Sequence, residues 1–314
     1  MRNAFRAGLI AAFTIAGIDI AVAQDTVPAK QLFGQMAAPA DLRARSIGFY
    51  SRGCLAGGVA LAVDGPEWQA MRLSRNRYWG MPVLIDYIEQ LARESKTYDG
   101  WPGLLVGDLS QPRGGPMLFG HASHQVGLDV DIWFDPMPDR TLTEAERETI
   151  SARSYVKPGT NVDLDTTMWT DAHSRLIKRA ASYPEVERVF VNAGVKKVLC
   201  EWAGADRAWL RKIRPWYKHD DHLHVRLACP PDMDGCKRQD PTPPGDGCGE
   251  NLAWWLSDVP YRPAPKPDKP AKPRPAMTLG GLPAACRTVL AAPDPGSTTV
   301  QVNIPLPRAR PLAN

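Results

Sequence analysis

Two short stretches hold nearly all of the imidazole groups in this chain. The first, residues 120–133, reads Gly-His-Ala-Ser-His-Gln-Val-Gly-Leu-Asp-Val-Asp-Ile-Trp, and the second, residues 219–226, reads His-Asp-Asp-His-Leu-His-Val-Arg. Imidazole and carboxylate groups are common zinc ligands in proteins, and carboxylates also orient such ligands. Of the six histidines in the chain, five lie in these stretches: His121, His124, His219, His222 and His224. This concentration indicates a metal site.

The spacing within each stretch predicts which of these side chains share a face. His222 and His224 are two residues apart, so on a strand both side chains point to the same face. In the first stretch apolar residues alternate with Asp129 and Asp131. A strand there would bury the apolar residues and leave both carboxylates on one open face. If the two open faces coincide, histidine and aspartate ligands converge.

His124 and Asp131 are separated by an odd number of positions, so a continuous strand would send them to opposite faces. The chain must therefore turn between them, and Gly127 is where a residue without a side chain allows the turn. Three protein ligands with an open position for water are typical of catalytic zinc, whereas structural zinc is closed by four ligands, mostly cysteine. Neither stretch contains cysteine, so the pattern favours a catalytic site.

Each part of the pattern also has a simpler interpretation. A His-x-His pair on a strand can be a surface pair, an Asp-x-Asp strand can be a solvated edge, and His121 can cap a loop. Five histidines in two stretches favour metal binding over these alternatives. Asp220 and Asp221 are neighbours of the candidate ligands, and we expect them to be solvated or to orient those ligands.

The N-terminus is typical of an export signal. Arg2 and Arg6 precede a mostly apolar run from Leu9 to Ile18, and Ala-Val-Ala at 21–23 fits the small-residue rule for cleavage. The alternatives are an amphipathic first helix or a membrane anchor, but the run is too short to span a bilayer. We therefore predict a signal peptide at residues 1–23 and no integral membrane segment after its removal.

Export also affects the interpretation of the cysteines. The chain has six, and an even number in an exported chain favours disulfides over free thiols. Their spacing alone leaves the pairing open. No Cys-x-x-Cys pair occurs, so neither a thiolate zinc site nor a thioredoxin-like centre is indicated.

Length and charge limit the classes of protein to consider. A chain of 314 residues with 44% hydrophobic composition can bury a sizeable core, and we expect one catalytic domain with additions rather than two equal domains. The net charge of +4 is mild. It gives no support for a nucleic-acid partner and would suit weak attraction to an anionic polymer.

Sequence periodicity predicts an α+β fold: a small, mostly antiparallel sheet that carries the zinc site and is flanked by helices. Apolar residues at helical spacing predict helices at 81–96 and 171–182, and a more polar helix at 142–153 has Thr141 as its expected cap. A loop is expected at 161–167 and a short amphipathic piece at 42–50. The predicted strands are 103–108, 128–133, 186–191 and 223–227.

The two stretches resemble known zinc peptidases. His124 and Asp131 with six residues between them, combined with His222-x-His224, look like the zinc signature of the lysostaphin, D-Ala-D-Ala metallopeptidase and hedgehog-type group. More narrowly, residues 120–132 resemble the penicillin-insensitive murein endopeptidase family. The likeness covers about residues 46–290. Further stretches that support it are 77–80, 106–108, 209–216 and 245–249.

This resemblance implies a periplasmic zinc peptidase that cuts the D-Ala to meso-diaminopimelate cross-link of peptidoglycan. It implies these site residues by position: zinc ligands His124, Asp131 and His224, the additional ligand His121, the catalytic histidine His222 and the accessory catalytic-site residue His219. It also implies the disulfides Cys54–Cys286, Cys200–Cys248 and Cys229–Cys236. In one departure, the family pattern has Asp and His before the second helix, where a second metal is placed. This chain has no histidine between His124 and His173, so Asp163 or Asp165 would have to stand in.

The resemblance also suggests a division of the chain. We predict a zinc peptidase domain at 24–258 and a proline-rich C-terminal extension at 259–314 that is tied back through Cys286. Residues 263–275 alternate proline with charged residues and alanine, which predicts an extended tether. Beyond the tether only Cys286 looks anchored, and we expect the final residues to be largely disordered.

The predicted reaction is hydrolysis by a metal-activated water. No serine is acylated in such a reaction, which would explain insensitivity to β-lactams. His222, as a histidine beside the metal that is not a ligand, could act as a base or stabilise the oxyanion. Two alternatives remain. A D,D-carboxypeptidase shares the chemistry but needs a closed pocket for a free carboxylate, and a peptidoglycan-binding protein could keep the fold without turnover.

Overall fold

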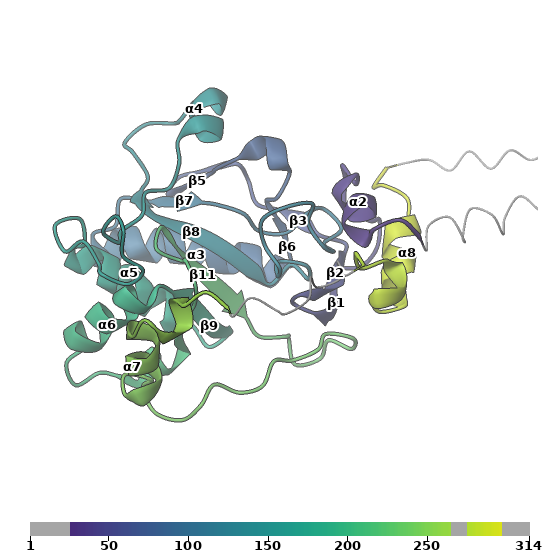
Figure 1. Cartoon of the computed structure of the whole chain (residues 1–314). Coiled ribbons are helices and arrows are strands. Elements are labelled where there is room, and N and C mark those ends of the chain that lie inside the picture. Colours follow the sequence, from purple (N-terminus) through teal and green to yellow (C-terminus); the bar gives the residue numbers. More distant parts are fainter. Residues whose placement is uncertain (1–25, 265–274, 297–314) are drawn as a thin grey trace, which may run out of the picture.

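One mixed sheet forms the centre of the molecule (Figure 1). The computed structural model describes residues 26–264 and 275–296, and its seven-stranded sheet has the order β10-β9-β11-β8-β7-β5-β4. The β10–β9 and β5–β7 pairs are parallel and the other pairs are antiparallel. The predicted α+β fold with mostly antiparallel strands is therefore confirmed. The sheet's strands are β4 Asp64–Gly65, β5 Trp68–Ala70, β7 Leu104–Val106, β8 Asp129–Pro136, β9 Val186–Val191, β10 Ile213–Pro215 and β11 His222–Leu227.

Two short antiparallel strand pairs are separate from the main sheet. They are formed by β1 Arg45–Phe49 with β2 Arg52–Ala56, and by β3 Val59–Ala60 with β6 Trp79–Gly80. The helices are α2 Ala29–Gly34, α3 Pro82–Asp99, α4 Glu144–Thr149, α5 Asp171–Ser182, α6 Ala193–Trp202, α7 Glu250–Leu256 and α8 Ala285–Ala291. In Figure 1, α2 and α8 lie beside β1 and β2 at one end of the molecule, and α5, α6 and α7 lie at the other. None of the described helices is long and apolar enough to span a bilayer.

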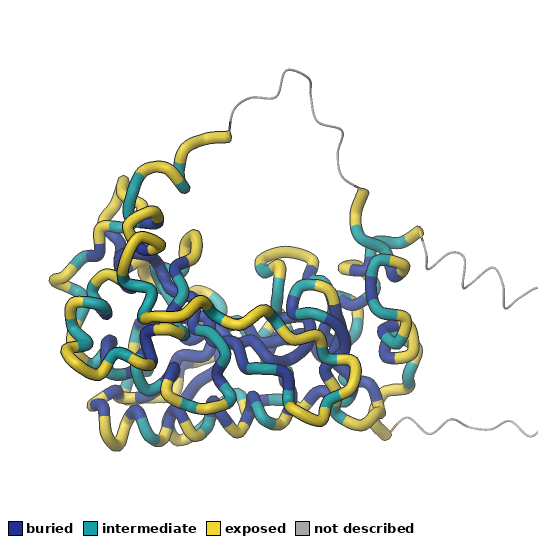
Figure 2. The backbone as a smooth tube through the Cα atoms, turned by 90° about the horizontal axis from the view of Figure 1, so that it is seen from below, coloured by how far each residue is buried: buried dark blue, intermediate teal, exposed yellow. Residues whose placement is uncertain are grey.

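One face of the sheet packs on the main apolar core, and the opposite face carries the acidic residues of β8 and the histidines of β11. Val130 and Ile132 of β8 are fully buried in the main core, to which α3 and α5 also contribute. Asp129 and Asp131 alternate with them and therefore lie on the opposite face. In β11, His224 pairs directly with Asp131. Figure 2 shows that the backbone through the middle of the molecule is mostly buried and that exposed segments surround it.

The predicted helices differ in how well they match the structure. The helix at 171–182 is confirmed as α5, and the helix at 81–96 is confirmed as α3, which continues to Asp99. The helix predicted at 142–153 is wrong at both ends, because α4 spans only Glu144–Thr149 and its cap is Thr143 rather than Thr141. Thr143 accepts from the backbone of Glu146, whose side chain binds back to Thr143. This reciprocal pair fixes the start of the helix.

Elsewhere, local pattern was less informative. The segment at 42–50, expected to be a short amphipathic piece, contains strand β1. Its apolar run is too short for periodicity to distinguish a helix from a strand. The predicted loop at 161–167 contains no helix or strand, and α6, α7 and α8 were not predicted.

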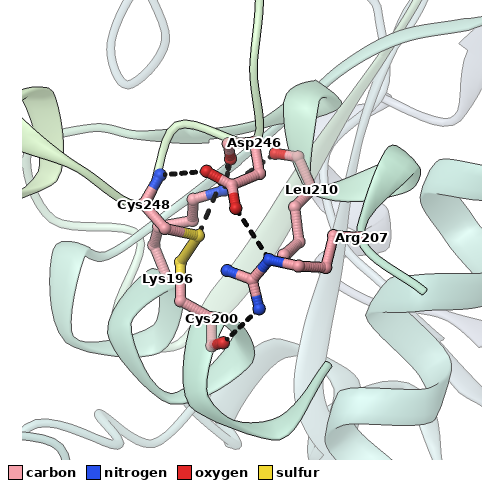
Figure 3. The surroundings of a disulfide bond; sticks show 6 residues. All are labelled: Lys196, Cys200, Arg207, Leu210, Asp246 and Cys248. Atoms are coloured by element: carbon pink, nitrogen blue, oxygen red, sulfur yellow. Dashed lines mark hydrogen bonds and ion pairs between the residues drawn. A yellow bond between two sulfur atoms is a disulfide. The ribbon is translucent and has the colours of Figure 1, made fainter. Parts of the chain in front are cut away.

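Three disulfides hold the fold: Cys54–Cys286, Cys200–Cys248 and Cys229–Cys236. They are the pairs that the resemblance implied. Figure 3 shows the surroundings of Cys200–Cys248, where the Lys196 ammonium donates to the carbonyls of Leu210 (2.8 Å) and Asp246 (2.6 Å). Burial lowers the pKa of Lys196 to about 7. The disulfide and this lysine together fasten the loop that leads into α7.

The described residues after the proline-rich segment are anchored at several points. Besides Cys286, the side chains of Leu279, Leu282 and Val289 are buried. The guanidinium of Arg113 donates to the carbonyls of residues 289, 290 and 292. The expectation that only Cys286 is anchored there is therefore wrong, since one buried arginine and a small apolar cluster also hold α8. The predicted signal peptide, most of the predicted tether and the final residues lie outside the described residues.

Candidate metal centre

Four imidazoles surround the buried carboxylate of Asp131. Its Oδ1 lies 3.4 Å from His124 Nε2, 3.6 Å from His224 Nδ1 and 3.6 Å from His222 Nε2. Its Oδ2 lies 3.4 Å from His121 Nε2. In His121, His124 and Asp131, one ligand atom from each residue lies within 4.8 Å of the others. The structure therefore brings together all four predicted ligands, with His222 beside them.

The turn predicted between His124 and Asp131 is present. Gly127 has a φ of +73° and His124 itself has a φ of +65°, so the chain reverses its side-chain alternation before β8 begins. A Cβ on Gly127 would lie 2.9 Å from Leu55 and 3.0 Å from the backbone nitrogen of Met81. Glycine is therefore required there for both backbone conformation and space.

Two buried polar atoms at the centre have no hydrogen-bond partner among the described residues. The Nδ1–H of His124 donates to the Leu109 carbonyl at 3.0 Å, so Nε2 carries a lone pair when the ring is neutral. This Nε2 and Asp131 Oδ1 are buried and unpartnered. Such atoms are rare because burial without a partner is costly. Ligands at about 2.0–2.1 Å from a tetrahedral zinc lie roughly 3.3 Å apart, which is close to the 3.4 Å between these two atoms. The donor set fits a zinc ion.

Asp129 orients His224 at the candidate centre. Its Oδ1 accepts from His224 Nε2 at 2.8 Å and from Arg226 Nε at 2.7 Å, and its Oδ2 accepts from the His124 backbone. Burial opposes ionisation, but Arg226 and His224 hold the pKa of Asp129 well below its usual range. Burial lowers the pKa of His224 to about 3. His224 is therefore neutral, and its Nδ1 lone pair faces Asp131.

His121 lies at the edge of the centre. Its Nε2 is 3.1 Å from Asp108 Oδ2, and its side chain is 24% exposed. Asp108 also pairs with Arg77 (2.8 Å) and Arg75 (3.0 Å). Burial opposes its ionisation, but His121 and the two arginines lower the pKa of Asp108 to about 2. Sequence reasoning assigned no role to Asp108, although its position directly after a buried strand could have suggested one.

His222 and His219 occupy the mouth of the centre. Asp221 Oδ1 lies 2.5 Å from His222 Nδ1, so this carboxylate orients the ring. Burial disfavours the imidazolium, but Asp131 and Asp221 raise the pKa of His222 to about 9. The His219 ring lies 4.9 Å from the His222 ring, its Nδ1 donates to the Tyr217 carbonyl, and burial lowers its pKa to about 4.

The other acidic residues considered from the sequence lie elsewhere. Asp220 binds the Ser154 hydroxyl. Asp165 accepts from the backbone and hydroxyl of Thr167. Among the residues that the structure describes, neither Asp163 nor Asp165 belongs to a cluster of potential metal ligands.

Cavities adjoin the centre on two sides. One of about 240 Å³ is lined by Arg72, Arg75, Asp108 and Trp133, and another of about 660 Å³ is lined by Arg188, Phe190, Trp216 and Tyr217. Both include His121 and His222 in their walls. The centre is therefore reached from two directions.

Helix α7 supports the aromatic wall of the larger cavity. Its Trp255 ring lies 4.9 Å from the Tyr217 ring and 6.1 Å from the Trp216 ring. The Phe190 ring lies 5.2 Å from the His224 ring. The larger cavity therefore has an aromatic wall of Phe190, Trp216 and Tyr217 beside the centre, and α7 packs behind that wall. Sequence reasoning missed this wall, because its residues come from separate segments of the chain.

Comparison with known proteins identifies the family. The family described as penicillin-insensitive murein endopeptidase matches residues 46–291. A relative of that name from Haemophilus influenzae is 41% identical over 255 residues, which is 81% of this chain and 85% of the relative. One from Yersinia enterocolitica is 37% identical over 284 residues, or 88% of this chain and 96% of the relative. One from Escherichia coli is 41% identical over 248 residues, or 79% of this chain and 86% of the relative.

These matches place the chain among the peptidases, a class of hydrolase. The chain belongs to the penicillin-insensitive murein endopeptidase family. This confirms the resemblance that its two histidine-containing stretches predicted.

Proposed function

We propose that this protein is a zinc-dependent murein D,D-endopeptidase that hydrolyses the D-Ala to meso-diaminopimelate cross-link of peptidoglycan. Family membership supports the peptidase activity and the murein substrate. The observation that carries the zinc assignment is the pair of buried, unpartnered atoms, His124 Nε2 and Asp131 Oδ1, at 3.4 Å from each other. The predicted signal peptide at 1–23 and the murein substrate support a periplasmic location.

In this proposal His124, Asp131 and His224 hold zinc, and His121 is an additional ligand. When bound, zinc supplies Lewis-acid polarisation of the scissile carbonyl and lowers the pKa of a coordinated water. The chain's own residues prepare the ligands. Leu109 and Asp129 fix the protons of His124 and His224 on the nitrogens that face away from the centre. Each ring therefore presents a lone pair.

His222 is the proposed catalytic histidine. Its Nε2 faces the centre and its Nδ1 is held by Asp221, so the ring can accept a proton from the attacking water or, when protonated, donate to the oxyanion. His219 lies beside it and is the proposed accessory residue. No serine forms an acyl intermediate in this scheme, which accounts for insensitivity to β-lactams.

The two cavities favour an endopeptidase over a D,D-carboxypeptidase. A carboxypeptidase needs a closed pocket for a terminal carboxylate, whereas the two flanking cavities could receive peptide on both sides of the scissile bond. The complete ligand set and His222 favour an enzyme over a peptidoglycan-binding protein without turnover.

Product analysis distinguishes these functions. Zinc-loaded protein is incubated with cross-linked peptide dimers and, separately, with monomeric pentapeptides, and the products are resolved by chromatography and mass spectrometry. We expect dimers to give monomers and pentapeptides to remain intact. Release of D-Ala from pentapeptides, with the dimers left intact, would establish a carboxypeptidase. Binding of either substrate without any product would establish a non-catalytic protein.

A further inference from the structure

Two arginines lie opposite each other on neighbouring strands, two residues along from the level of His224. Arg226 of β11 is directly opposite Arg188 of β9, just as His224 is directly opposite Phe190. Residues two apart on a strand lie about 7 Å from each other on the same face. Both arginines line the cavity of about 660 Å³, together with His222 and His224. This places two cations in the groove, within reach of a group bound at the centre.

Only one of these cations is neutralised by a carboxylate. Arg226 pairs with Asp129 at 2.7 Å, donates to Gln239 at 3.0 Å and stacks over the Tyr50 ring. Arg188 donates from Nη2 to the Asp240 backbone carbonyl, but within the described residues it forms no ion pair. Its Nε is buried and has no hydrogen-bond partner.

The two facing arginines reduce the stability of the protein without substrate. Like charges directly opposite each other on neighbouring strands destabilise a sheet. A buried N–H without a partner adds a further cost. The charge of the adjacent Glu187 opposes the burial that lowers the pKa of Arg188, but its carboxylate accepts from the Tyr50 hydroxyl and forms no ion pair with Arg188. An anion in the cavity would compensate the charge of Arg188.

We propose that Arg188, with Arg226 beside it, binds a free carboxylate of the peptide substrate. The inference rests on the proposed function and names the group that the site selects. The carboxylate we assign is the one on the diamino acid carbon that carries the nitrogen of the scissile bond. This carboxylate lies only a few bonds from the reacting carbonyl. The side chain of Arg188, two residues along the strand from Phe190, can therefore reach it.

The surroundings strengthen such a contact. Phe190 and Trp216 line the same groove, and apolar walls exclude water and increase the strength of an ion pair. Arginine matches the two oxygens of a carboxylate better than lysine because its N–H groups form a planar fork. Arg188 would thus act in substrate positioning and selectivity.

The test uses two cross-linked peptide dimers that differ only at this group, which is a carboxylate in one and a carboxamide in the other. Dissociation constants are measured by calorimetry with zinc-loaded protein that carries His222→Ala to prevent turnover. Arg188→Gln removes the guanidinium and Arg188→Lys keeps the charge. Arg93→Gln removes an exposed arginine of α3 and serves as the matched control. Thermal unfolding of each variant checks its fold.

We expect Arg188→Gln to weaken binding of the carboxylate dimer by about 10- to 100-fold and binding of the carboxamide dimer by less than about twofold. Arg188→Lys should retain part of the preference, and Arg93→Gln all of it. Equal weakening of both dimers, or an unchanged preference for the carboxylate, would overturn the proposal. Cleavage of the carboxylate dimer by the protein with His222 intact is measured in parallel. If the proposed function is wrong, the protein with His222 intact will not cleave the dimer, whatever the binding preference is.

Discussion

His124 Nε2 and Asp131 Oδ1 face each other at 3.4 Å, and neither has a hydrogen-bond partner among the described residues. A residue from the loop before β8 and a residue within β8 are brought together by the turn at Gly127. The same carboxylate lies 3.6 Å from His222 and from His224. The proposed ligands and the proposed catalyst therefore differ in the partner of their other ring nitrogen, which is the Leu109 carbonyl for His124, Asp129 for His224 and Asp221 for His222.

This distinction predicts different phenotypes for two neighbouring histidines. His222→Ala should lower dimer cleavage by about 100-fold or more while most of the zinc is retained, because it removes proton transfer and leaves the ligands intact. His224→Ala should lose both activity and zinc. Metal analysis and cleavage rates of the two variants check this. An active His222→Ala variant, or one that is as depleted of zinc as His224→Ala, would show that the roles are wrongly assigned.

Asp129 should control metal affinity without being a ligand. Asp129→Asn keeps the shape of the side chain but weakens the contacts to His224 and Arg226, so zinc affinity should fall by about 10- to 100-fold. Competition with a chromogenic chelator measures this. Asp163→Asn, which removes an exposed carboxylate, is the control and should bind zinc like the unmodified protein. Unchanged affinity in Asp129→Asn would contradict the orienting role.

Buried His173 should make the fold sensitive to mild acid. Its ring is packed against Trp101, Trp169 and Tyr155, and burial lowers its pKa to about 4. The unfolded chain binds this proton near pH 6.5, so the stabilising contribution is fully present above that pH and is lost as pH falls toward 4. The loss should be on the order of 2–3 kcal/mol.

Urea unfolding at pH 7 and pH 4.5 measures the His173 effect. His173→Gln is the matched variant, because glutamine can still accept from the Thr170 backbone in the capping box but does not titrate. The variant should lose less stability than the unmodified protein between the two pH values. An equal loss in both proteins would show that other groups cause the acid sensitivity.

The Cys54–Cys286 disulfide should contribute more stability than Cys229–Cys236. The first joins residues 232 apart and the second joins residues 7 apart, and closing a longer loop restricts the unfolded chain more. Replacing both Cys54 and Cys286 by serine should cost about 2–5 kcal/mol. The same replacement at Cys229 and Cys236 is the comparison. Equal unfolding free energies for the two variants would contradict the loop-length explanation.

Sequence spacing indicated which candidate ligands share a face, because alternation along a strand determines the side to which a residue points. Spacing placed His222 and His224 on one face and left open whether Asp131 shares it; the register of β8 and β11, which pairs His224 with Asp131, shows that it does. The same reasoning did not show that Asp108 and Arg77 meet His121, since both come from another part of the chain and only the fold brings them together.

Parts of the fold that depend on distant contacts were also missed. Helix α8 is held by Arg113, which caps its carbonyls from a remote loop, and nothing in the local sequence near 285–291 indicates this partner. The pairing of Arg188 with Arg226 depends on strand order, which periodicity does not provide. Local pattern therefore predicted the candidate metal centre better than the cavity around it.

The most direct test of the account is a zinc titration of the chelator-treated protein. Zinc is removed, known equivalents are added back, and cleavage of cross-linked dimers is measured after each addition. Activity should be absent at first, rise in proportion to bound zinc and reach its maximum at about one zinc per chain, as a single centre at His124, Asp131 and His224 requires. Full cleavage by the zinc-depleted protein, or no cleavage after zinc is restored, would contradict the central claim.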